Sequence, residues 1–467
     1  MNGFQPIAWE DRERLRAYYA ACPYALCEYA WGTKWMWRDY LHPEWAELAG
    51  CLVVANTIKG RLCFDYPVPG PHGDEAAALG AIETLCRDRE LPLEISVVPE
   101  EKAPALLFRY PHAKVSNVRS WQDYLYRREE LAEFTGRRLR NPRNHLNKFY
   151  KLWPEAELRP LGREDGAAIE GFWADYQGEL ESAGKSWDPR ELERSKELLA
   201  LAGEPCFCAG GLFLGETLLG LSLGEVSGET LIIHVEKALY SYSGVYQALV
   251  REFVRAFGGS CQWVNREDDA GDPGIRSSKL QYCPEKLLPK FRFRVENEFL
   301  LHLKEIPTLE TERLRLRALQ EADIPAYNAL VLDRERNRYW GFDDLGALEE
   351  PLGERSFFEV ARRDFQKGMA VNFAICLGER FIGEAVLYHY DFRGGMELGC
   401  RISREYAGMG YGREAFAALA HWGLYGLQLH RVYARCFREN EPSYKMLSSC
   451  MKACGEDEST CYFEKLV

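Results

Sequence analysis

Several features that would place this chain in a specialised class are missing from its sequence. No run approaches the roughly 18 apolar residues of a membrane span, and Met1–Leu15 contains early acids but no apolar stretch of a signal peptide. Basic residues number 59 against 71 acidic ones, and the net charge of −12 argues against a protein that coats DNA. We therefore expect a cytoplasmic chain with no transmembrane segment.

The cysteine pattern gives no indication of a metal centre or of disulfides. The chain has 15 cysteines, an odd number, and without a signal peptide this indicates reduced thiols. Cys450, Cys454 and Cys461 lie close together in the sequence, but no C-x-x-C pair accompanies them. We therefore predict that no metal is bound.

Apolar residues are plentiful, at 46% of the 467 residues, and aromatic residues make up 13%. At about 100–200 residues per domain, this length predicts two to four packed domains. A repeat supports this number, because Leu214–Gly220 (LGETLLG) and Leu377–Gly383 (LGERFIG) both predict a hairpin turn followed by a strand. After each motif come a second strand, a glycine turn, an amphipathic helix and a closing strand. The sequence therefore predicts the same α/β unit twice.

A third, more degenerate copy is predicted near the N-terminus. Cys51–Ile58 and Arg61–Tyr66 have the pattern of strands, Pro67–Gly70 that of a turn, and Asp74–Arg89 that of a helix. A domain boundary is predicted at Pro307, because proline would interrupt a helix or a central strand. We expect three α/β units, each a mixed twisted sheet flanked by helices, at residues 1–150, 151–304 and 305–467.

The glycine turn AGMGYG, Ala407–Gly412, is the strongest candidate for a binding motif. Gly408, Gly410 and Gly412 let the backbone approach an anion closely, and the N-terminus of the following helix adds partial positive charge. The spacing is not that of the dinucleotide motif G-x-G-x-x-G, and no G-K-[ST] P-loop is present. The turn therefore indicates a phosphate site, with a plain tight turn as the alternative.

From Leu309 onward the sequence resembles the GNAT N-acetyltransferase superfamily, and within it the ribosomal-protein N-acetyltransferase-like branch. Four segments carry the resemblance: LETERLRLRALQEAD, GERFIGEAVLY, MELGCRISREYAGMGYGREAF and NEPSYKML. It implies a GNAT-like fold for each repeated unit and acetyl-CoA as the acyl donor. It also implies transfer of the acetyl group to a primary amine of a small molecule or a peptide.

The resemblance also implies which residues bind the donor. The backbone of Cys400, Arg401, Ile402 and Ser403 is expected to pair with the pantetheine arm. The amides of Gly408, Met409, Gly410, Tyr411 and Gly412 are expected to hold the pyrophosphate. Asn440 and Ser443 are expected beside the donor, where the fourth and fifth strands splay apart.

Acyl transfer to an amine requires that the amine lose a proton, that the thioester carbonyl be polarised and that the departing thiolate be accommodated. A backbone N–H on the central strand can polarise the carbonyl. Glu397 on the central strand or Glu384 on the preceding strand is the candidate base. Ser443 and Tyr444 are the candidate acids. For each carboxylate, the alternative is a solvated residue on a strand.

Two departures from this branch keep a further function class open. Ala407 stands where the family loop often begins with Arg or Gln, and Leu447 stands where a Tyr often acts as the acid. A non-catalytic protein that binds acyl-CoA is therefore an alternative. The segment Arg336–Leu345 is expected to line the acceptor side, where Asp343 and Asp344 suggest a cationic acceptor or an ordinary turn.

About residues 4–295 resemble the C-terminal aminoacyl-transfer domain of phosphatidylglycerol lysyltransferases. Asp123–Phe149, Ile232–Phe253 and Val264–Phe291 carry this resemblance. It implies two tandem GNAT-like units, and it gives an alternative function: an aminoacyl-tRNA-dependent transferase that acts on a lipid, a peptide or a small amine. The middle unit's turn keeps only Gly244, so we do not expect that unit to bind CoA.

A basic stretch in this part is a candidate tRNA contact. Six cations without an intervening acid can bind phosphates, although a solvated or acid-paired face is the alternative. They are Arg137, Arg138, Arg140, Arg143, Lys148 and Lys151.

Polar residues also leave a strand end at Asn265–Asp269, either as ligand contacts or as an ion-pair network with Arg276 and Lys279. Glu236 and Lys237 are expected at the place that Ser403 and Arg404 occupy in the C-terminal unit. No pattern predicts an oligomeric state.

Overall fold

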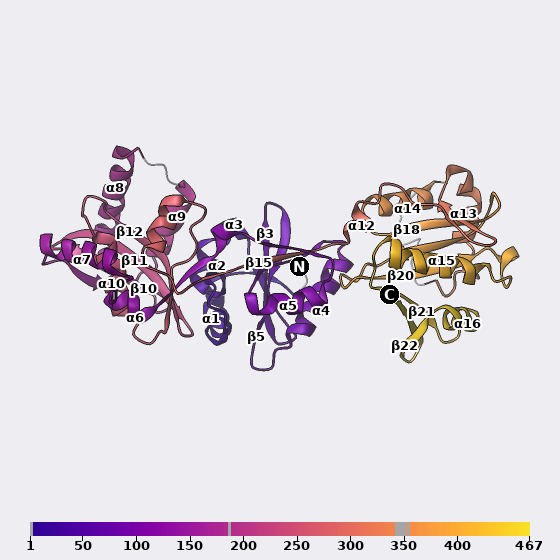
Figure 1. The fold of residues 1–467 in the computed structure, drawn as a ribbon, viewed down its shortest axis with the longest axis horizontal. Helices are drawn as coiled ribbons and strands as arrows, with labels where there is room; N and C mark the ends of the chain where they lie inside the picture. The colour runs from indigo at the N-terminus through magenta and orange to yellow at the C-terminus, as the bar shows by residue number, and fades with distance from the viewer. Residues whose placement is uncertain (1–2, 185–187, 341–352, 354) are drawn as a thin grey trace. The chain divides into compact units, whose positions relative to one another are not determined.

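The computed structural model describes residues 3–184, 188–340, 353 and 355–467 (Figure 1). Asp343 and Asp344 lie outside the described residues. The chain forms two compact units. The first comprises Met1–Thr84, Glu94–Ala105 and Val115–Arg294; the second comprises Leu85–Leu93, Leu106–Lys114 and Val295–Val467.

The first of three sheets has the strand order β1-β2-β3-β4-β6-β15-β7, with β5 paired to β3. Its strands are β1 (Gln5–Pro6), β2 (Glu44–Leu48), β3 (Cys51–Ile58), β4 (Arg61–Asp65), β5 (Val68–Pro69), β6 (Leu93–Val98), β7 (Ala113–Asn117) and β15 (Phe291–Val295). The helices of this stretch are α1 (Arg12–Ala21), α2 (Trp31–Met36), α3 (Arg38–Leu41), α4 (Glu75–Asp88) and α5 (Ala103–Arg109). The predicted strands and helix of the degenerate copy correspond to β3, β4 and α4.

The second sheet has the order β14-β8-β13-β12-β11-β10-β9. Its strands are β8 (Asp123–Arg127), β9 (Glu157–Pro160), β10 (Cys208–Leu214), β11 (Thr217–Ser227), β12 (Thr230–Ala238), β13 (Trp263–Asn265) and β14 (Lys286–Leu288). The helices are α6 (Arg128–Glu133), α7 (Arg140–Leu152), α8 (Gly166–Ser182), α9 (Pro189–Leu199), α10 (Val245–Phe257) and α11 (Pro273–Leu280).

The third sheet has the order β16-β17-β18-β19-β20-β21-β23-β22. Its strands are β16 (Leu309–Glu310), β17 (Arg315–Ala318), β18 (Val371–Leu377), β19 (Arg380–Tyr388), β20 (Gly395–Ile402), β21 (Arg431–Phe437), β22 (Lys452–Glu456) and β23 (Thr460–Leu466). The helices are α12 (Glu298–Leu301), α13 (Ile324–Val331), α14 (Ser356–Gln366), α15 (Tyr411–Gly426) and α16 (Glu441–Cys450).

The predicted repeat is confirmed in the second and third sheets. β10–β11–β12–α10–β13 and β18–β19–β20–α15–β21 follow the same order, and each first hairpin contains a β-bulge. The bulges lie at Leu212/Phe213 and at Ile375/Cys376. In both copies the strand before the helix pairs in parallel with the strand after it. The fold is therefore α/β, with mixed sheets flanked by helices.

The change from the first to the second sheet differs from the predicted boundary. Residue 150 falls inside α7, whereas β8 already pairs with β13 and β14. The chain then returns at β15 to the first sheet. The reason is physical: β8 lies between β13 and β14, which come much later in the chain, and local sequence pattern does not reveal such long-range pairing.

In the C-terminal unit, helices cover both faces of the third sheet. α15 packs on β19, β20 and β21 (Figure 1). Phe416 and Leu419 lie three positions apart, on the buried face of this helix. Alternate residues of β18 point to the other face, where Ala374 and Cys376 meet α13 and α14. Among the described residues, no helix combines the length and apolar character needed to cross a membrane.

Candidate active site

The central feature of the C-terminal unit is a gap between β20 and β21. These parallel strands pair only over Gly395–Glu397, and beyond that point the ladder ends. Ser403 N donates to Ile382 O on β19 at 2.8 Å, whereas Ile402 O accepts from Arg336 on the open side. Since peptide groups alternate in direction along a strand, those of Cys400 face the gap as well. The splay therefore turns the peptide groups of Cys400 toward the gap, beyond the end of the β20–β21 ladder.

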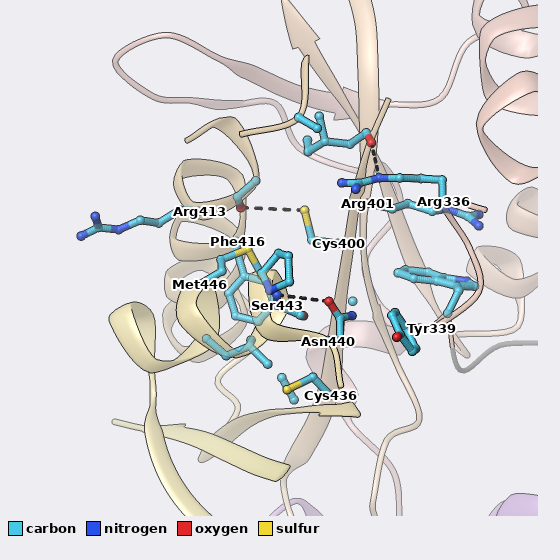
Figure 2. A pocket seen from close by; sticks show the side chains of 18 of the residues that line it. Arg336, Tyr339, Cys400, Arg401, Arg413, Phe416, Cys436, Asn440, Ser443 and Met446 are labelled. Atoms are coloured by element: carbon cyan, nitrogen blue, oxygen red, sulfur yellow. Dashed lines mark hydrogen bonds between the residues drawn. The ribbon is translucent and has the colours of Figure 1, made fainter. Parts of the chain in front are cut away.

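The gap opens into a cavity of about 880 Å³, within the range of small-molecule sites (Figure 2). β20, the glycine turn, β21 and the start of α16 all contribute to its wall. Of the residues predicted from sequence, those in the lining are Glu397, Cys400, Arg401, Ile402, Gly408, Gly410, Tyr411, Gly412, Asn440 and Ser443. Those outside the lining are Glu384, Ser403, Met409 and Tyr444.

The glycine turn has free space beside its backbone, and contacts from Arg313 fix its conformation. Gly408 and Gly410 have φ of +77° and +82°, and Gly410 is the N-cap of α15. A Cβ at Gly408 would find no atom within 4 Å. Arg313 fixes the turn from outside, donating to Met409 O at 3.1 Å while its guanidinium lies 4.7 Å from the Tyr411 ring centroid. The turn thus has room for an anion at a helix N-terminus.

The corresponding turn of the second sheet is closed. Gly244, the N-cap of α10, also has a positive φ of +92°. A Cβ there would overlap the carbonyl oxygen of His145 on α7 and stand 3.0 Å from the Cβ of Phe149. α7 therefore lies where a diphosphate would need to approach.

The corresponding gap of the first sheet is also filled. β4 and β6 pair in parallel over Phe64–Asp65 and Ile95–Ser96. Just beyond that pairing, the buried Tyr29 hydroxyl donates to Val97 O at 2.7 Å and to Tyr66 O at 3.4 Å. Pro67 and, in β5, Pro69 follow the gap and have no N–H to offer a phosphate.

Of the two candidate bases, Glu397 is the one that lines the cavity. Its side chain is 7% exposed, and Oε1 accepts from Arg435 Nε at 3.0 Å. Burial raises the pKa of Glu397, but hydrogen bonding from His389 and the Arg435 charge outweigh it, so the net pKa is lowered. The group is therefore ionised at neutral pH and available to a cationic amine.

Glu384, the other candidate base, has a different position. Its buried carboxylate pairs with Arg401 at 2.7 Å and accepts from Tyr327 and Asn372, each at 2.8 Å. These contacts use both oxygens and keep them out of the cavity. Glu384 therefore orients Arg401, and we do not retain it as a base.

The start of α16 separates the two candidate acids. Asn440 caps the helix, its Oδ1 accepting from Ser443 N at 3.3 Å (Figure 2). Ser443 lines the cavity, as does the buried Leu447. Tyr444 is 44% exposed and packs its ring on Phe463, because the next helical position points about 100° away. Tyr444 is therefore not retained as an acid.

Sequence reasoning missed several residues around Glu397. Tyr388 lies directly opposite Glu397 in the β19–β20 ladder, and its hydroxyl hydrogen-bonds to the Glu397 carboxylate. Arg435 and Tyr339 also line the cavity. Sequence alone could place Tyr388 in a strand, but it could not show that Tyr388 lies opposite Glu397, because that depends on the register between the two strands.

Two free thiols in the cavity wall are poor nucleophiles. Burial raises the pKa of Cys400 to about 12 and that of Cys436 to about 11. Both thiols therefore stay protonated near neutral pH, and a covalent acyl-cysteine step gains no support.

Polar clusters in the first unit form internal networks. Asp269 pairs with Arg276 at 2.9 Å and accepts a hydrogen bond from the Tyr124 hydroxyl at 2.7 Å. Of the two interpretations of Asn265–Asp269, ligand contacts or an ion-pair network, these contacts favour the network. Glu236 pairs with Arg266 at 2.6 Å. The β11–β12 ladder sets Glu236 opposite Ser222, just as the β19–β20 ladder sets Cys400 opposite Ala385. Glu236 therefore takes the place of Cys400 and not, as predicted, that of Ser403.

One group of potential metal ligands occurs among the described residues: Cys27, Glu28 and Asp123. Lys290 already supplies a cation there. Its ammonium lies 2.6 Å from Asp123 Oδ1, 2.7 Å from Glu28 Oε1 and 3.3 Å from Cys27 Sγ. A metal would have to displace this buried ammonium, so the donor set does not fit a metal.

The basic stretch lies on and before α7. Arg137, Arg138, Arg140, Lys148 and Lys151 are exposed. In the described part of the chain, neither these side chains nor Arg143 form an ion pair; Arg143 donates to Phe134 O at 2.6 Å. The alternative of acid pairing is therefore not what the structure shows, and the face is solvated.

Comparison with known proteins places this architecture. Residues 21–294, more than half of the chain, match the family described as phosphatidylglycerol lysyltransferase, C-terminal. The chain belongs to this family. Residues 313–450 match the acetyltransferase (GNAT) domain, so the C-terminal unit is an acyltransferase domain. The lysyltransferase-like part and the GNAT domain are thus fused in one chain.

Two individual relatives each match part of the chain. An uncharacterized N-acetyltransferase of Bacillus licheniformis is 29% identical over 145 residues, 30% of this chain and 80% of that protein. An uncharacterized protein of Mycoplasmoides gallisepticum is 25% identical over 174 residues, 37% of this chain and 56% of that protein. The chain thus spans little more than half the length of that relative.

A crystal structure of a conserved protein of unknown function from Bacteroides thetaiotaomicron is 23% identical, with a TM-score of 0.59. It covers 63% of this chain and 99% of its own chain, and this likeness supports the fold alone.

Proposed function

We propose that the C-terminal unit transfers an acetyl group from acetyl-CoA to a primary amine of a small molecule or peptide, by direct attack. One observation carries the proposal: an open three-glycine turn, a splayed strand with free peptide groups and an ionised carboxylate share one cavity. The cysteines are all free, which suits a cytoplasmic site of action.

Each part of the cavity has a role in this reaction. The amides of Gly408–Gly412 and the N-terminus of α15 hold the pyrophosphate, and the peptide groups of Cys400 pair with the pantetheine arm. Acetyl-CoA supplies the activated acyl group. Glu397 accepts a proton from the ammonium form of the acceptor, directly or through water, and a β20 N–H facing the gap polarises the thioester carbonyl.

Ser443 is the remaining candidate for protonating the thiolate. It lines the cavity one turn from the buried Leu447, so a hydroxyl is present where the family's usual acid is not. A thiolate is also a competent leaving group without full protonation. The acid is therefore the least essential of the three requirements.

Gly412 offers a sharp test of the donor site. Its backbone is not left-handed, and a Cβ would lie 3.4 Å from Ile402, an ordinary contact. Gly412→Ala should therefore keep acetyl-CoA binding. Gly412→Asp adds a negative charge that favours the helix N-terminus but repels a phosphate, so it should abolish binding without loss of stability.

Calorimetric titration of acetyl-CoA into the wild type and both variants measures this. Binding by the wild type and Gly412→Ala but not by Gly412→Asp supports the site. Equal binding by all three places the donor elsewhere, and no binding to the wild type contradicts an acetyl-CoA-dependent reaction.

Turnover is then measured as thiol release with a panel of primary amines: peptides with free N-termini, polyamines and small amine metabolites. Glu397→Gln should lower the rate about a hundredfold or more, as expected for loss of a general base. Binding without turnover of any amine, unchanged in Glu397→Gln, favours the alternative of a non-catalytic acyl-CoA-binding protein.

A second candidate function concerns the first unit. The family match and the exposed, unpaired basic stretch favour an aminoacyl-tRNA-dependent transfer to a lipid, a peptide or a small amine. Reversing the charge of Arg140, Lys148 and Lys151 should weaken tRNA binding and flatten its salt dependence. If acetyl-CoA binding is unchanged in the same variant, the two activities belong to different units.

A further inference from the structure

His389, directly after β19, has a conformation that needs an explanation. Its φ is +50°, which is uncommon for a residue other than glycine and is found disproportionately at functional sites. The Tyr433 hydroxyl donates to the His389 carbonyl oxygen at 2.8 Å and holds the backbone there. The strain fixes the imidazole beside β20.

The imidazole connects Glu397 to solvent. His389 Nδ1 lies 3.5 Å from Glu397 Oε2, while Arg435 occupies the other carboxylate oxygen. The Glu397 side chain is 7% exposed and lines the cavity, whereas the His389 side chain is 41% exposed and is not part of the lining. A proton that reaches Glu397 inside the cavity can therefore leave through His389 on its other side.

The charged and titratable groups around this pair come from β19 and β21, the two strands that flank β20. Tyr388 from β19 hydrogen-bonds to Glu397, and burial raises its pKa, so it stays a neutral donor. From β21, Arg435 contacts Glu397, and burial likewise raises the pKa of Tyr433. Among these groups, only the imidazole has two ring nitrogens, so it can accept a proton on one nitrogen and release one from the other.

We propose that His389 is a positioning residue that relays the proton of the acyl acceptor from Glu397 to solvent. This rests on the proposed function. The acceptor enters as an ammonium ion and loses one proton to Glu397, which passes it to His389 and so to water. The amine nitrogen forms the N–C bond, the C–S bond breaks, and the second N–H proton goes to the CoA sulfur. One amide, one thiol and one released proton balance the step.

His389→Asn separates the relay from structure. Asparagine tolerates a positive φ and can still donate to Glu397, but its amide cannot take up a further proton and pass it on. Arg435→Met is the matched control, because it also removes a group that lowers the pKa of Glu397 while leaving the imidazole. Both variants are assayed for kcat and KM across pH with the best amine of the panel, with and without added imidazole.

The relay predicts that His389→Asn lowers kcat about tenfold, that acetyl-CoA affinity by calorimetry is unchanged, and that free imidazole restores much of the rate. Arg435→Met should move the acid limb of the pH profile upward, because the Glu397 pKa rises, and imidazole should not help. A His389→Asn enzyme with wild-type kcat, or with a loss that imidazole does not restore, overturns the relay while leaving the proposed function intact. If no amine is acetylated by the wild type, the proposed function fails and the relay fails with it.

Discussion

A methyl group on one turn glycine in each of two units should separate stability from donor binding. At Gly244, with φ +92°, the new Cβ overlaps the His145 carbonyl oxygen and crowds Phe149. A left-handed alanine costs roughly 1 kcal/mol and overpacking adds about 1–3 kcal/mol, so Gly244→Ala should lose about 2–4 kcal/mol of unfolding free energy. At Gly408, with φ +77° and no atom within 4 Å, only the conformational cost of about 1 kcal/mol remains.

Donor binding should respond in the opposite order. Gly408 lines the cavity, and a methyl group there stands where the backbone must approach a phosphate. Losing one hydrogen bond to a charged group costs about 1.5–3 kcal/mol, or roughly a 10- to 150-fold rise in the acetyl-CoA Kd. Gly244 lies beneath α7 and should leave that Kd unchanged.

Urea unfolding and calorimetric titration of the full chain measure both quantities. Hydrogen exchange of the α10 and α15 peptides shows which unit opens first. If Gly244→Ala weakens acetyl-CoA binding as much as Gly408→Ala does, the turn before α10 binds the donor and the comparison of the two turns is refuted. The same holds if Gly408→Ala binds like the wild type.

The buried pairs give two further predictions. Burial opposes the charge of His234, but hydrogen bonds to Glu225 and Glu267 raise its pKa to about 9 from 6.5. Because the pKa is higher in the folded state, protonation of His234 stabilises the fold fully below pH 6.5, and this stabilisation is lost as the pH rises through 9. The unfolding free energy should therefore fall by about 3 kcal/mol over that window. The same pH dependence in His234→Gln, measured by urea titration, would refute this. Glu384→Gln should cost about 3 kcal/mol by leaving Arg401 uncompensated; a variant of wild-type stability but no turnover would instead restore Glu384 as the base.

Local patterns predicted the framework of the site well. The two LGE hairpins, the helices after the glycine turns and the closing strands all depend on alternation, helical spacing and glycine, which act over a few residues. Glu397 and the glycine turn lie within those elements, so their meeting at the splay follows from the fold. The cavity lining at Asn440 and Ser443 likewise follows from a helix that starts at the end of β21.

What could not be predicted depends on register between distant segments. Glu384 and Glu397 both lie in apolar strand segments and look alike in the sequence. The β19–β20 ladder, however, sets Glu384 opposite Arg401 and Glu397 opposite Tyr388. One carboxylate is thereby paired and closed off, and the other faces the cavity. The change of sheet before β8 was missed for the same reason, since its partners β13 and β14 lie far along the chain.

The three sheets share a parallel strand pair that opens beyond its last rung, yet the openings differ in what fills them. Tyr29 closes the first, and His234–Glu267 and Glu236–Arg266 pairs bridge the second, where α7 also covers the turn. In the third, Arg435 contacts Glu397 at the base and Arg336 donates to Ile402 O on the open side, and these groups line a cavity. An acyl-CoA donor needs the gap and the exposed turn amides together, so the shared fold cannot by itself assign it to any unit. Only the residues that fill each gap make that assignment, and they point to the third.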